Sequence, residues 1–233
     1  MHPCEAEIEA SPLLAGLFPP GIVAMATLQP GNPALLTPAE QAQIERARPK
    51  RVGEYAAGRL CARRVLAAFG LANFELLAGP DRAPLWPPGI VGSISHVEGY
   101  CGAAVAERSR FRSLGLDIEL DGRVTAELHE QILTPAERRY LAKNAQLDRW
   151  ATLAFAVKEA FYKCQYPLTG EWLDFTDIEI DFTPLMDAPA AASGGLVATP
   201  CRSLGMEQYW PPPWQARFVR CSERVYAGFA VPL

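Results

Sequence analysis

Two carboxylates stand two residues apart in the segment Asp117-Ile118-Glu119. On a β-strand, residues i and i+2 share a face, so these two side chains would lie next to each other while the flanking leucines turn to the core. Carboxylates held together repel, and one of them tends to stay protonated. A hard divalent cation removes this penalty, and Mg²⁺ prefers a few carboxylates together with phosphate oxygens. The pair is therefore a candidate metal site, although the polar face of an edge strand gives the same pattern.

A third acidic residue, Glu159, lies in the segment FAVKEAFYK at 155–163. Glu159 and Lys163 have the i, i+4 spacing in the order that favours a helix, and Lys158 lies beside them in the sequence. An ordinary helix with one surface ion pair would look the same. The alternative is that Glu159 joins the first two carboxylates as a third metal ligand.

Two further segments could bind anions. The segment WPPGIVGSISH at 86–96 would end a strand on Ser95 and His96, where the small preceding residues allow a ligand to approach closely. Residues 45–64 carry seven basic side chains against two acidic ones in a chain of net charge −4, and such a local excess can hold an anion. A core histidine and a solvated helix face are the ordinary alternatives. No G-x-S-x-G elbow occurs, which argues against a serine hydrolase.

The elements that must position these residues are those of an α+β protein. Apolar period-two segments predict strands, and capped segments with proline in the first turn predict helices. We expect strands at 21–28, 90–95, 99–106, 113–120, 176–182, 214–220 and 225–231. We expect helices after Thr37 and at 51–69, 124–133, 135–143 and 147–165, and a surface loop over 187–200.

A weak internal repeat divides these elements into two sets. The sequence LTPAE at 36–40 recurs at 133–137, and the pattern Y-x-G-x-A-V at 100–105 recurs at 226–231. Each LTPAE copy has the composition of a helix start, with a threonine cap, proline at the first position and glutamate in the first turn. Because the echoes keep their order, we predict two similar halves, 1–112 and 113–233, with chance similarity as the alternative.

The composition is that of a globular protein, with 49% apolar and 21% charged residues in a chain of 233. No apolar run approaches the ~18 residues of a membrane span, and the acidic net charge gives no sign of nucleic-acid binding. The six cysteines include no C-x-x-C pair, so we expect a reduced, cytoplasmic protein. No P-loop or dinucleotide-binding glycine motif occurs.

Taken in order, four blocks of the sequence resemble one family. They are GRLCAR at 58–63, RAPLWPPGIVGSISH at 82–96, LGLDIE at 114–119 and FAVKEAFYK at 155–163. The chain resembles the 4′-phosphopantetheinyl transferases of the larger, pseudo-dimeric class (the Sfp type), and within it the siderophore-synthetase component D branch. Order, spacing and chemistry agree across all four blocks, which makes their combination specific.

The resemblance implies transfer of the phosphopantetheine arm of coenzyme A to a serine of an apo acyl or peptidyl carrier protein, with release of 3′,5′-bisphosphoadenosine. It implies two similar α+β halves related by a pseudo-two-fold axis, with the active site in the cleft between them. It also implies Mg²⁺, or Mn²⁺, which suits the same oxygen ligands. The metal ligands would be Asp117, Glu119 and Glu159, and Glu159 would be the base for the carrier serine, directly or through a metal-bound water.

The remaining implied roles concern coenzyme A and the partners. The implied coenzyme A-binding residues are Arg51, Arg59, Arg82, Ser95, His96, Lys158 and Lys163, of which the two lysines would also neutralise charge during catalysis. The acceptor would be an acidic helical carrier of siderophore, non-ribosomal peptide or polyketide biosynthesis, served by a monomer. Two other interpretations remain for the same residues. One is a metal-dependent coenzyme A phosphodiesterase, and the other is a non-catalytic module that binds carrier proteins or coenzyme A.

Overall fold

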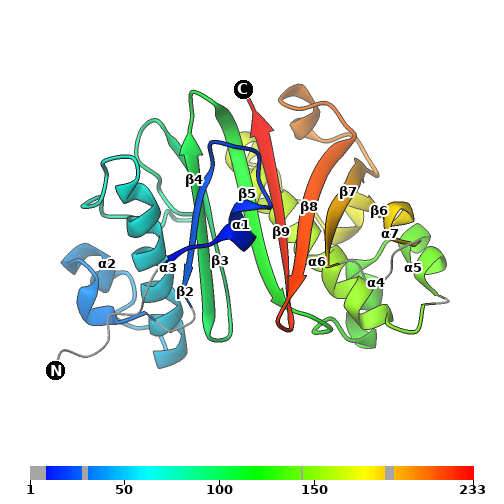
Figure 1. Ribbon diagram of the computed structural model, residues 1–233, viewed down its shortest axis with the longest axis horizontal. Coiled ribbons are helices and arrows are strands. Elements are labelled where there is room, and N and C mark those ends of the chain that lie inside the picture. The colour runs from blue at the N-terminus through cyan, green and yellow to red at the C-terminus, as the bar shows by residue number, and fades with distance from the viewer. Residues whose placement is uncertain (1–8, 28–30, 143, 187–191) are drawn as a thin grey trace. The chain divides into compact units, whose positions relative to one another are not determined.

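The structure is a computed structural model that describes residues 9–27, 31–142, 144–186 and 192–233. These residues form two compact units, each described by itself below (Figure 1). The first unit runs to Leu114 and includes Pro232 and Leu233, and the second is Gly115–Val231. The sequence predicted the boundary between residues 112 and 113, inside the strand that links the two units.

The first unit is a four-stranded antiparallel sheet with a long helix on one face (Figure 1). The strand order is β1-β2-β4-β3, with β1 at Glu9–Ala10, β2 at Val23–Thr27, β3 at Ile90–Val97 and β4 at Tyr100–Glu107. The helical segments are α1 (Pro12–Ala15), η1 (Pro33–Leu35), α2 (Pro38–Ala42) and α3 (Pro49–Ala67). Ala57, Cys61 and Val65 of α3 pack with Ile90 and Val105 of the sheet, so burial of this apolar stripe fixes the rotation of α3.

The second unit contains a five-stranded sheet of order β5-β9-β8-β7-β6 and a helix of 23 residues, α6 (Leu147–Thr169). The strands are β5 (Phe111–Leu120), β6 (Ile178–Asp181), β7 (Ser193–Pro200), β8 (Trp214–Cys221) and β9 (Arg224–Pro232). Phe161 of α6 contacts Trp214 and Phe229, with ring centroids 4.6 and 5.4 Å apart. The shorter helices are η2 (Ala126–Leu128), α4 (His129–Ile132), α5 (Pro135–Leu141), η3 (Phe175–Asp177), α7 (Thr183–Met186) and η4 (Gly205–Gln208).

The two LTPAE copies start α2 and α5 with the same capping box. In each, the threonine hydroxyl accepts the backbone N–H of the glutamate, and the glutamate carboxylate accepts that of the threonine. Both glutamates, Glu40 and Glu137, are buried. The predicted helix starts are therefore correct, while a pseudo-two-fold relation between the whole halves stays a prediction.

Two predicted elements differ from the structure. The surface loop expected over 187–200 contains strand β7, which pairs with both β6 and β8. Small residues conceal this strand in the sequence, although Leu196 and Ala198 are fully buried. The helix expected over 124–133 is broken into η2 and α4. The segment 187–191 lies outside the described residues.

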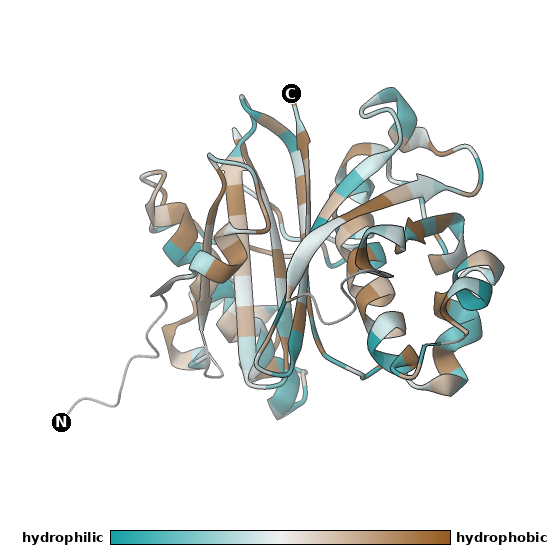
Figure 2. Cartoon of the chain, turned by 45° about the vertical axis from the view of Figure 1, so that its right-hand side comes forward, coloured by the Kyte–Doolittle hydropathy of each residue, from teal (hydrophilic) through white to brown (hydrophobic). Residues whose placement is uncertain are grey.

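Buried and more exposed positions alternate along β3 and along β8, and bands of polar and apolar colour cross the strands in Figure 2. This alternation is the pattern of elements with one buried face. None of the helices in the described part of the chain is long and apolar enough to cross a membrane. The described cysteines, Cys61, Cys101, Cys164, Cys201 and Cys221, are free thiols.

Candidate active site

Gly115 brings strand β5 into direct contact with helix α6. A Cβ atom at this position would overlap the carbonyl oxygen of Ala160 and lie 2.8 Å from the amide nitrogen of Cys164. Both of these are backbone atoms, which cannot rotate out of the way as a side chain can. Asp117 and Glu119 follow Gly115 at intervals of two, on the same face of the strand. The glycine therefore allows the helix to lie beside the strand face that carries both carboxylates.

Lys163 of α6 joins the two elements through Asp117. Its ammonium donates to Asp117 Oδ1 at 2.6 Å and to the carbonyl of Leu116 at 3.3 Å. Burial alone would lower the pKa of Lys163, but the charges of Asp117, Glu159 and Glu119 raise it above its usual value. Lys163 is thus a held cation at the centre of the predicted carboxylate group.

Glu119 and Glu159 complete this group. Burial raises the pKa of both carboxyls, and the charge of Asp117 raises them further. Arg123 opposes the effect at Glu119, where its guanidinium donates to Oε2 at 2.6 Å. Glu159 is half-buried on α6, where its pKa responds to Asp117 and Lys163. The three predicted metal ligands therefore share one electrostatic environment.

The donor chemistry of this environment fits Mg²⁺, since all three groups are carboxylates. Burial, followed by repulsion from Asp117, raises the pKa of Glu119 and of Glu159, and a divalent cation would relieve this repulsion. As the described side chains stand, no three Asp, Glu, His or Cys residues converge closely enough to hold a metal ion. Lys163 and Arg123 contact the oxygens of Asp117 and Glu119 instead. Bound metal would require these cations to share or release the oxygens.

An aromatic cluster that the sequence analysis missed continues the same stripe of α6. Glu159, Tyr162, Lys163 and Tyr166 have the i, i+3, i+4, i+7 spacing of one helix face. Tyr162 stacks on Tyr166 at 5.3 Å and meets Trp172 edge to face at 5.4 Å between ring centroids. Trp172 is 72% exposed. The helical period could have revealed the two tyrosines, but Trp172 follows the helix and comes near only through the loop.

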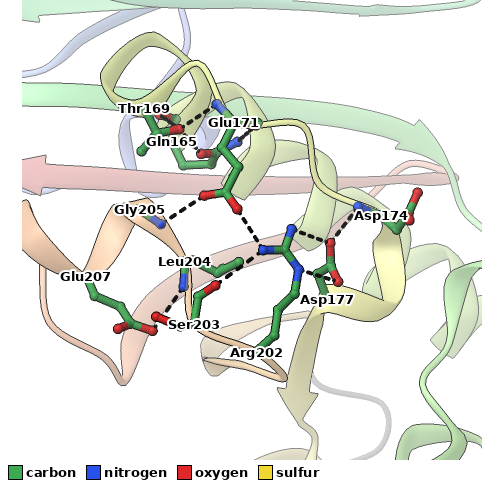
Figure 3. A network of polar contacts seen from close by, with 10 residues as sticks. All are labelled: Gln165, Thr169, Glu171, Asp174, Asp177, Arg202, Ser203, Leu204, Gly205 and Glu207. Carbon is green, nitrogen blue, oxygen red and sulfur yellow. Dashed lines mark hydrogen bonds and ion pairs between the residues drawn. The ribbon is translucent and has the colours of Figure 1, made fainter.

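A polar network anchors the loop that carries Trp172 (Figure 3). Arg202 donates to both oxygens of Asp177, at 2.9 and 3.0 Å, and to Glu171 Oε1 at 2.7 Å. The other oxygen of Glu171 accepts the backbone N–H of Gly205 at 2.8 Å. These hydrogen bonds to Arg202 lower the pKa of Asp177 and of Glu171. The loop between α6 and β6 is therefore tied to the segment after β7.

Lys158 lies elsewhere than the resemblance implied. Its ammonium is buried and donates to Glu137 Oε2 at 2.7 Å and to the carbonyl of Ile132 at 2.9 Å. Burial lowers its pKa, and Glu137 offsets the effect only in part. Consecutive helical residues point in directions about 100° apart, so Lys158 faces the interior while Glu159 is half-buried. We assign Lys158 to the support of α6, and its implied contact with coenzyme A stays a prediction.

Arg51 and His96, two residues predicted to bind coenzyme A, lie next to each other in the first unit. Arg51 Nη1 lies 3.1 Å from His96 Nε2 and 3.6 Å from Glu54 Oε2. Glu54, which the sequence analysis did not single out, is 4.0 Å from the same imidazole nitrogen. Ser95 is buried and precedes His96 on β3, so its side chain points to the opposite face of the sheet.

Arg59 lies on α3, and Arg82 lies in the segment that follows this helix. Arg59 is 7% exposed, its Nε donates to the carbonyl of Leu76 at 2.7 Å, and its guanidinium lies 4.0 Å above the ring of Tyr55. Burial lowers the pKa of Arg59. Arg82 is exposed at a turn with φ +68°, and its N–H donates to the carbonyl of Gly79 at 2.9 Å. Arg59 is therefore held, whereas Arg82 projects from a turn.

Comparisons with known proteins cover both units. The model of the 4′-phosphopantetheinyl transferase N-terminal domain matches residues 39–106, and that of the 4′-phosphopantetheinyl transferase superfamily matches residues 113–192. The 4′-phosphopantetheinyl transferase Svp of Streptomyces mobaraensis is 42% identical over 159 residues, which are 66% of this chain and 65% of that protein. The chain thus spans slightly less than two thirds of Svp.

Two further relatives extend the match. The 4′-phosphopantetheinyl transferase Npt of Nocardia iowensis is 33% identical over 183 residues, 78% of this chain and 82% of that protein. Enterobactin synthase component D of Escherichia coli (strain K12) is 39% identical over 126 residues, 52% of this chain and 58% of that protein. The matched family ranges contain all the candidate residues described above. The chain belongs to the 4′-phosphopantetheinyl transferase family, in its larger, Sfp-like class, and is a transferase.

Proposed function

We propose that this chain transfers the phosphopantetheine arm of coenzyme A to a serine of an apo acyl or peptidyl carrier protein. The serine oxygen forms a bond to the phosphorus that carries the pantetheine, and the bond from that phosphorus to the bridging oxygen of the pyrophosphate breaks. 3′,5′-Bisphosphoadenosine leaves with the bridging oxygen, and the serine proton passes to a base. Charge grows on the phosphoryl oxygens in such a step, and held cations stabilise it.

The observation that carries the proposal is the group that β5 and α6 form in the second unit. Asp117, Glu119 and Glu159 share one environment with the held cation Lys163. An ordinary surface ion pair would not raise the pKa of two carboxyls at once. Clusters of this kind, with several shifted pKa values, are typical of functional sites.

Each residue of the group has a role in the proposed reaction. Asp117, Glu119 and Glu159 would hold Mg²⁺, or Mn²⁺, which would supply positive charge at the diphosphate. Lys163 would donate to phosphoryl oxygens and neutralise developing charge. Glu159 is the candidate base, since its raised pKa lies closer to neutrality than that of a free carboxylate. Tyr162 and Trp172 would offer an apolar surface to the uncharged arm, next to the charged group.

The first unit would bind the nucleotide end of coenzyme A. Arg51, Arg59 and His96 are the principal candidates, and we retain Arg82 and Ser95 as predicted contacts. Arg59 supports this assignment, because it is buried without a carboxylate within 4 Å among the described residues. The charge of Glu40 offsets the burial of this cation only in part, and a phosphate would compensate the remaining cost. We expect the enzyme to act as a monomer in the cytoplasm.

The proposed function is tested by intact mass measurement after incubation with coenzyme A, Mg²⁺ and a panel of apo carrier proteins. We expect a carrier to gain the mass of one phosphopantetheine arm. Glu159→Gln should reduce transfer at least a hundredfold and change coenzyme A binding less, because it removes a group that acts on the reacting atoms. Coenzyme A cleavage without carrier modification would favour the phosphodiesterase. Full function of Glu159→Gln would favour the non-catalytic module.

A further inference from the structure

Two residues at helix α2 form hydrogen bonds to the backbone of the segment 76–78. Glu40 Oε1 accepts the backbone N–H of Leu76 at 3.2 Å. Gln43, the residue that ends α2, accepts the N–H of Ala78 at 2.9 Å and donates to the carbonyl of the same residue at 2.9 Å. We call Glu40 and Gln43 the α2 bracket. The bracket binds an irregular segment that also forms an isolated β-bridge from Ala78 to Pro84.

The α2 bracket supports Arg59 indirectly, through Leu76 and through Tyr55, and makes no hydrogen bond to its guanidinium. Leu76, whose N–H binds Glu40, offers its carbonyl to Arg59 Nε at 2.7 Å. Gln43 Oε1 accepts the hydroxyl of Tyr55 at 2.7 Å, and the ring of Tyr55 lies 4.0 Å under the Arg59 guanidinium. The two direct supports of Arg59 are therefore each held by one residue of the bracket.

We propose that Glu40 and Gln43 are positioning residues that preset the Arg59 guanidinium for a phosphate of coenzyme A. The proposal rests on the proposed function, in which Arg59 binds that phosphate. An arginine loses considerable side-chain entropy when it is ordered. A guanidinium that is already held loses less of it on binding, and the gain appears as ligand affinity. The bracket should thus act on coenzyme A binding and leave the chemical step unchanged.

The second unit contains, around Glu137, the same arrangement of hydrogen bonds that surrounds Glu40 in the first unit. Glu40 Oε2 accepts the N–H of Thr37 and a donor from Arg63, which also donates to the carbonyl of Leu35. Glu137 Oε2 likewise accepts the N–H of Thr134 and the ammonium of Lys158, which also donates to the carbonyl of Ile132. Glu137 Oε1 accepts the backbone N–H of Ile180, as Glu40 Oε1 accepts that of Leu76. The carbonyl that binds the cation, that of Leu35 or Ile132, precedes the glutamate by five residues in both units.

Each copy supports a long helix close to a candidate site residue. Arg63 lies one helical turn beyond Arg59 on α3, and Lys158 immediately precedes Glu159 on α6. A buried ion pair is a poor source of stability, because desolvation offsets most of its attraction. Its occurrence on the same glutamate oxygen in both units, with an arginine in one and a lysine in the other, therefore favours a positioning role over a purely stabilising one.

The decisive variant is Gln43→Ala, with Gln41→Ala as the matched control. Both glutamines belong to the α2 region, but Gln41 donates to the carbonyls of Pro33 and Leu36, away from the segment 76–78. Binding of coenzyme A to the Mg²⁺-loaded enzyme is measured by titration calorimetry, and thermal unfolding is recorded for each variant. We expect Gln43→Ala to weaken coenzyme A binding about three- to tenfold. The control should change binding less than twofold.

A double-mutant cycle with Arg59→Gln separates positioning from general destabilisation. If Gln43 acts through Arg59, Gln43→Ala should have no further effect on coenzyme A binding in the Arg59→Gln background. Steady-state kinetics should show a raised KM for coenzyme A with kcat unchanged. Additive effects, or equal effects of the two glutamine variants, would overturn the inference while leaving the proposed function intact. Unchanged coenzyme A binding by Arg59→Gln itself would overturn both the inference and the nucleotide-binding role of Arg59.

Discussion

Replacing Gly115 by alanine should separate β5 from α6 and damage the site without removing any functional group. The new methyl would overlap the carbonyl oxygen of Ala160 and lie 2.8 Å from the Cys164 nitrogen. Since both obstacles are backbone, relief requires the helix or strand to move, and overpacking of this kind costs about 1–3 kcal/mol. For a chain of this size that loss lowers Tm by roughly 2–12 °C. A displacement of about 1 Å at the site can reduce the rate on the order of a hundredfold.

The assay is transfer to a carrier protein at saturating coenzyme A and Mg²⁺, below the onset of unfolding. Gly195→Ala is the matched control, because this glycine also lies in a strand of the second unit but its added Cβ would meet only Ala216 O, at 3.8 Å. We expect the control to retain kcat and Tm. If Gly115→Ala behaves like Gly195→Ala in both measurements, the close approach of β5 and α6 does not position the site.

Two further predictions concern ion pairs of the second unit. Glu137→Gln should destabilise the protein by about 3–5 kcal/mol, since it leaves the ammonium of Lys158 buried without a counter-charge, whereas Lys158→Met should cost less because two backbone N–H groups still satisfy Glu137. Both are measured by urea unfolding, and loss of transfer by folded Lys158→Met would contradict its supporting role. Arg202→Gln should lower Tm at pH 7. The difference in Tm between this variant and the unchanged protein should shrink as the pH falls below about 4.5 and through the lowered pKa values of Glu171 and Asp177. The reason is that these carboxyls stabilise the fold only when they are ionised. A pH-independent difference would contradict this assignment.

Periodicity predicted the face of the carboxylate pair but could not predict its neighbours. The alternation at 114–120 placed Asp117 and Glu119 on one side of a strand, as observed. Nothing local indicated that Gly115 serves a helix that begins more than thirty residues later, because that contact depends on tertiary packing. The i, i+4 spacing of Glu159 and Lys163 predicted that both side chains lie on one face of a helix. The position of Lys158 beside Glu159 in the sequence did not predict which way its side chain points. A lysine beside a site residue can face solvent or the core, and only the packed structure distinguishes the two.

Strand β7 illustrates the limit for secondary structure. Its two glycines and its alanine give weak strand propensity, and what orders them is pairing with β6 and β8 on both sides. The helix starts at Thr37 and Thr134 were predictable because a capping box is a local device written in four residues. The partners of their glutamates lie on distant segments and left no pattern in the sequence.

The paired glutamate arrangements also set an order in which parts of the chain can become native. Helices α2 and α5 have five and seven residues, too few for a helix to persist alone in water. Their glutamates bind backbone groups 36 and 43 residues further along, and closing loops of that length costs entropy before any contact repays it. Each short helix should therefore acquire its native form late, after the long helix and the distant segment have met, and should be among the first parts to exchange amide hydrogens.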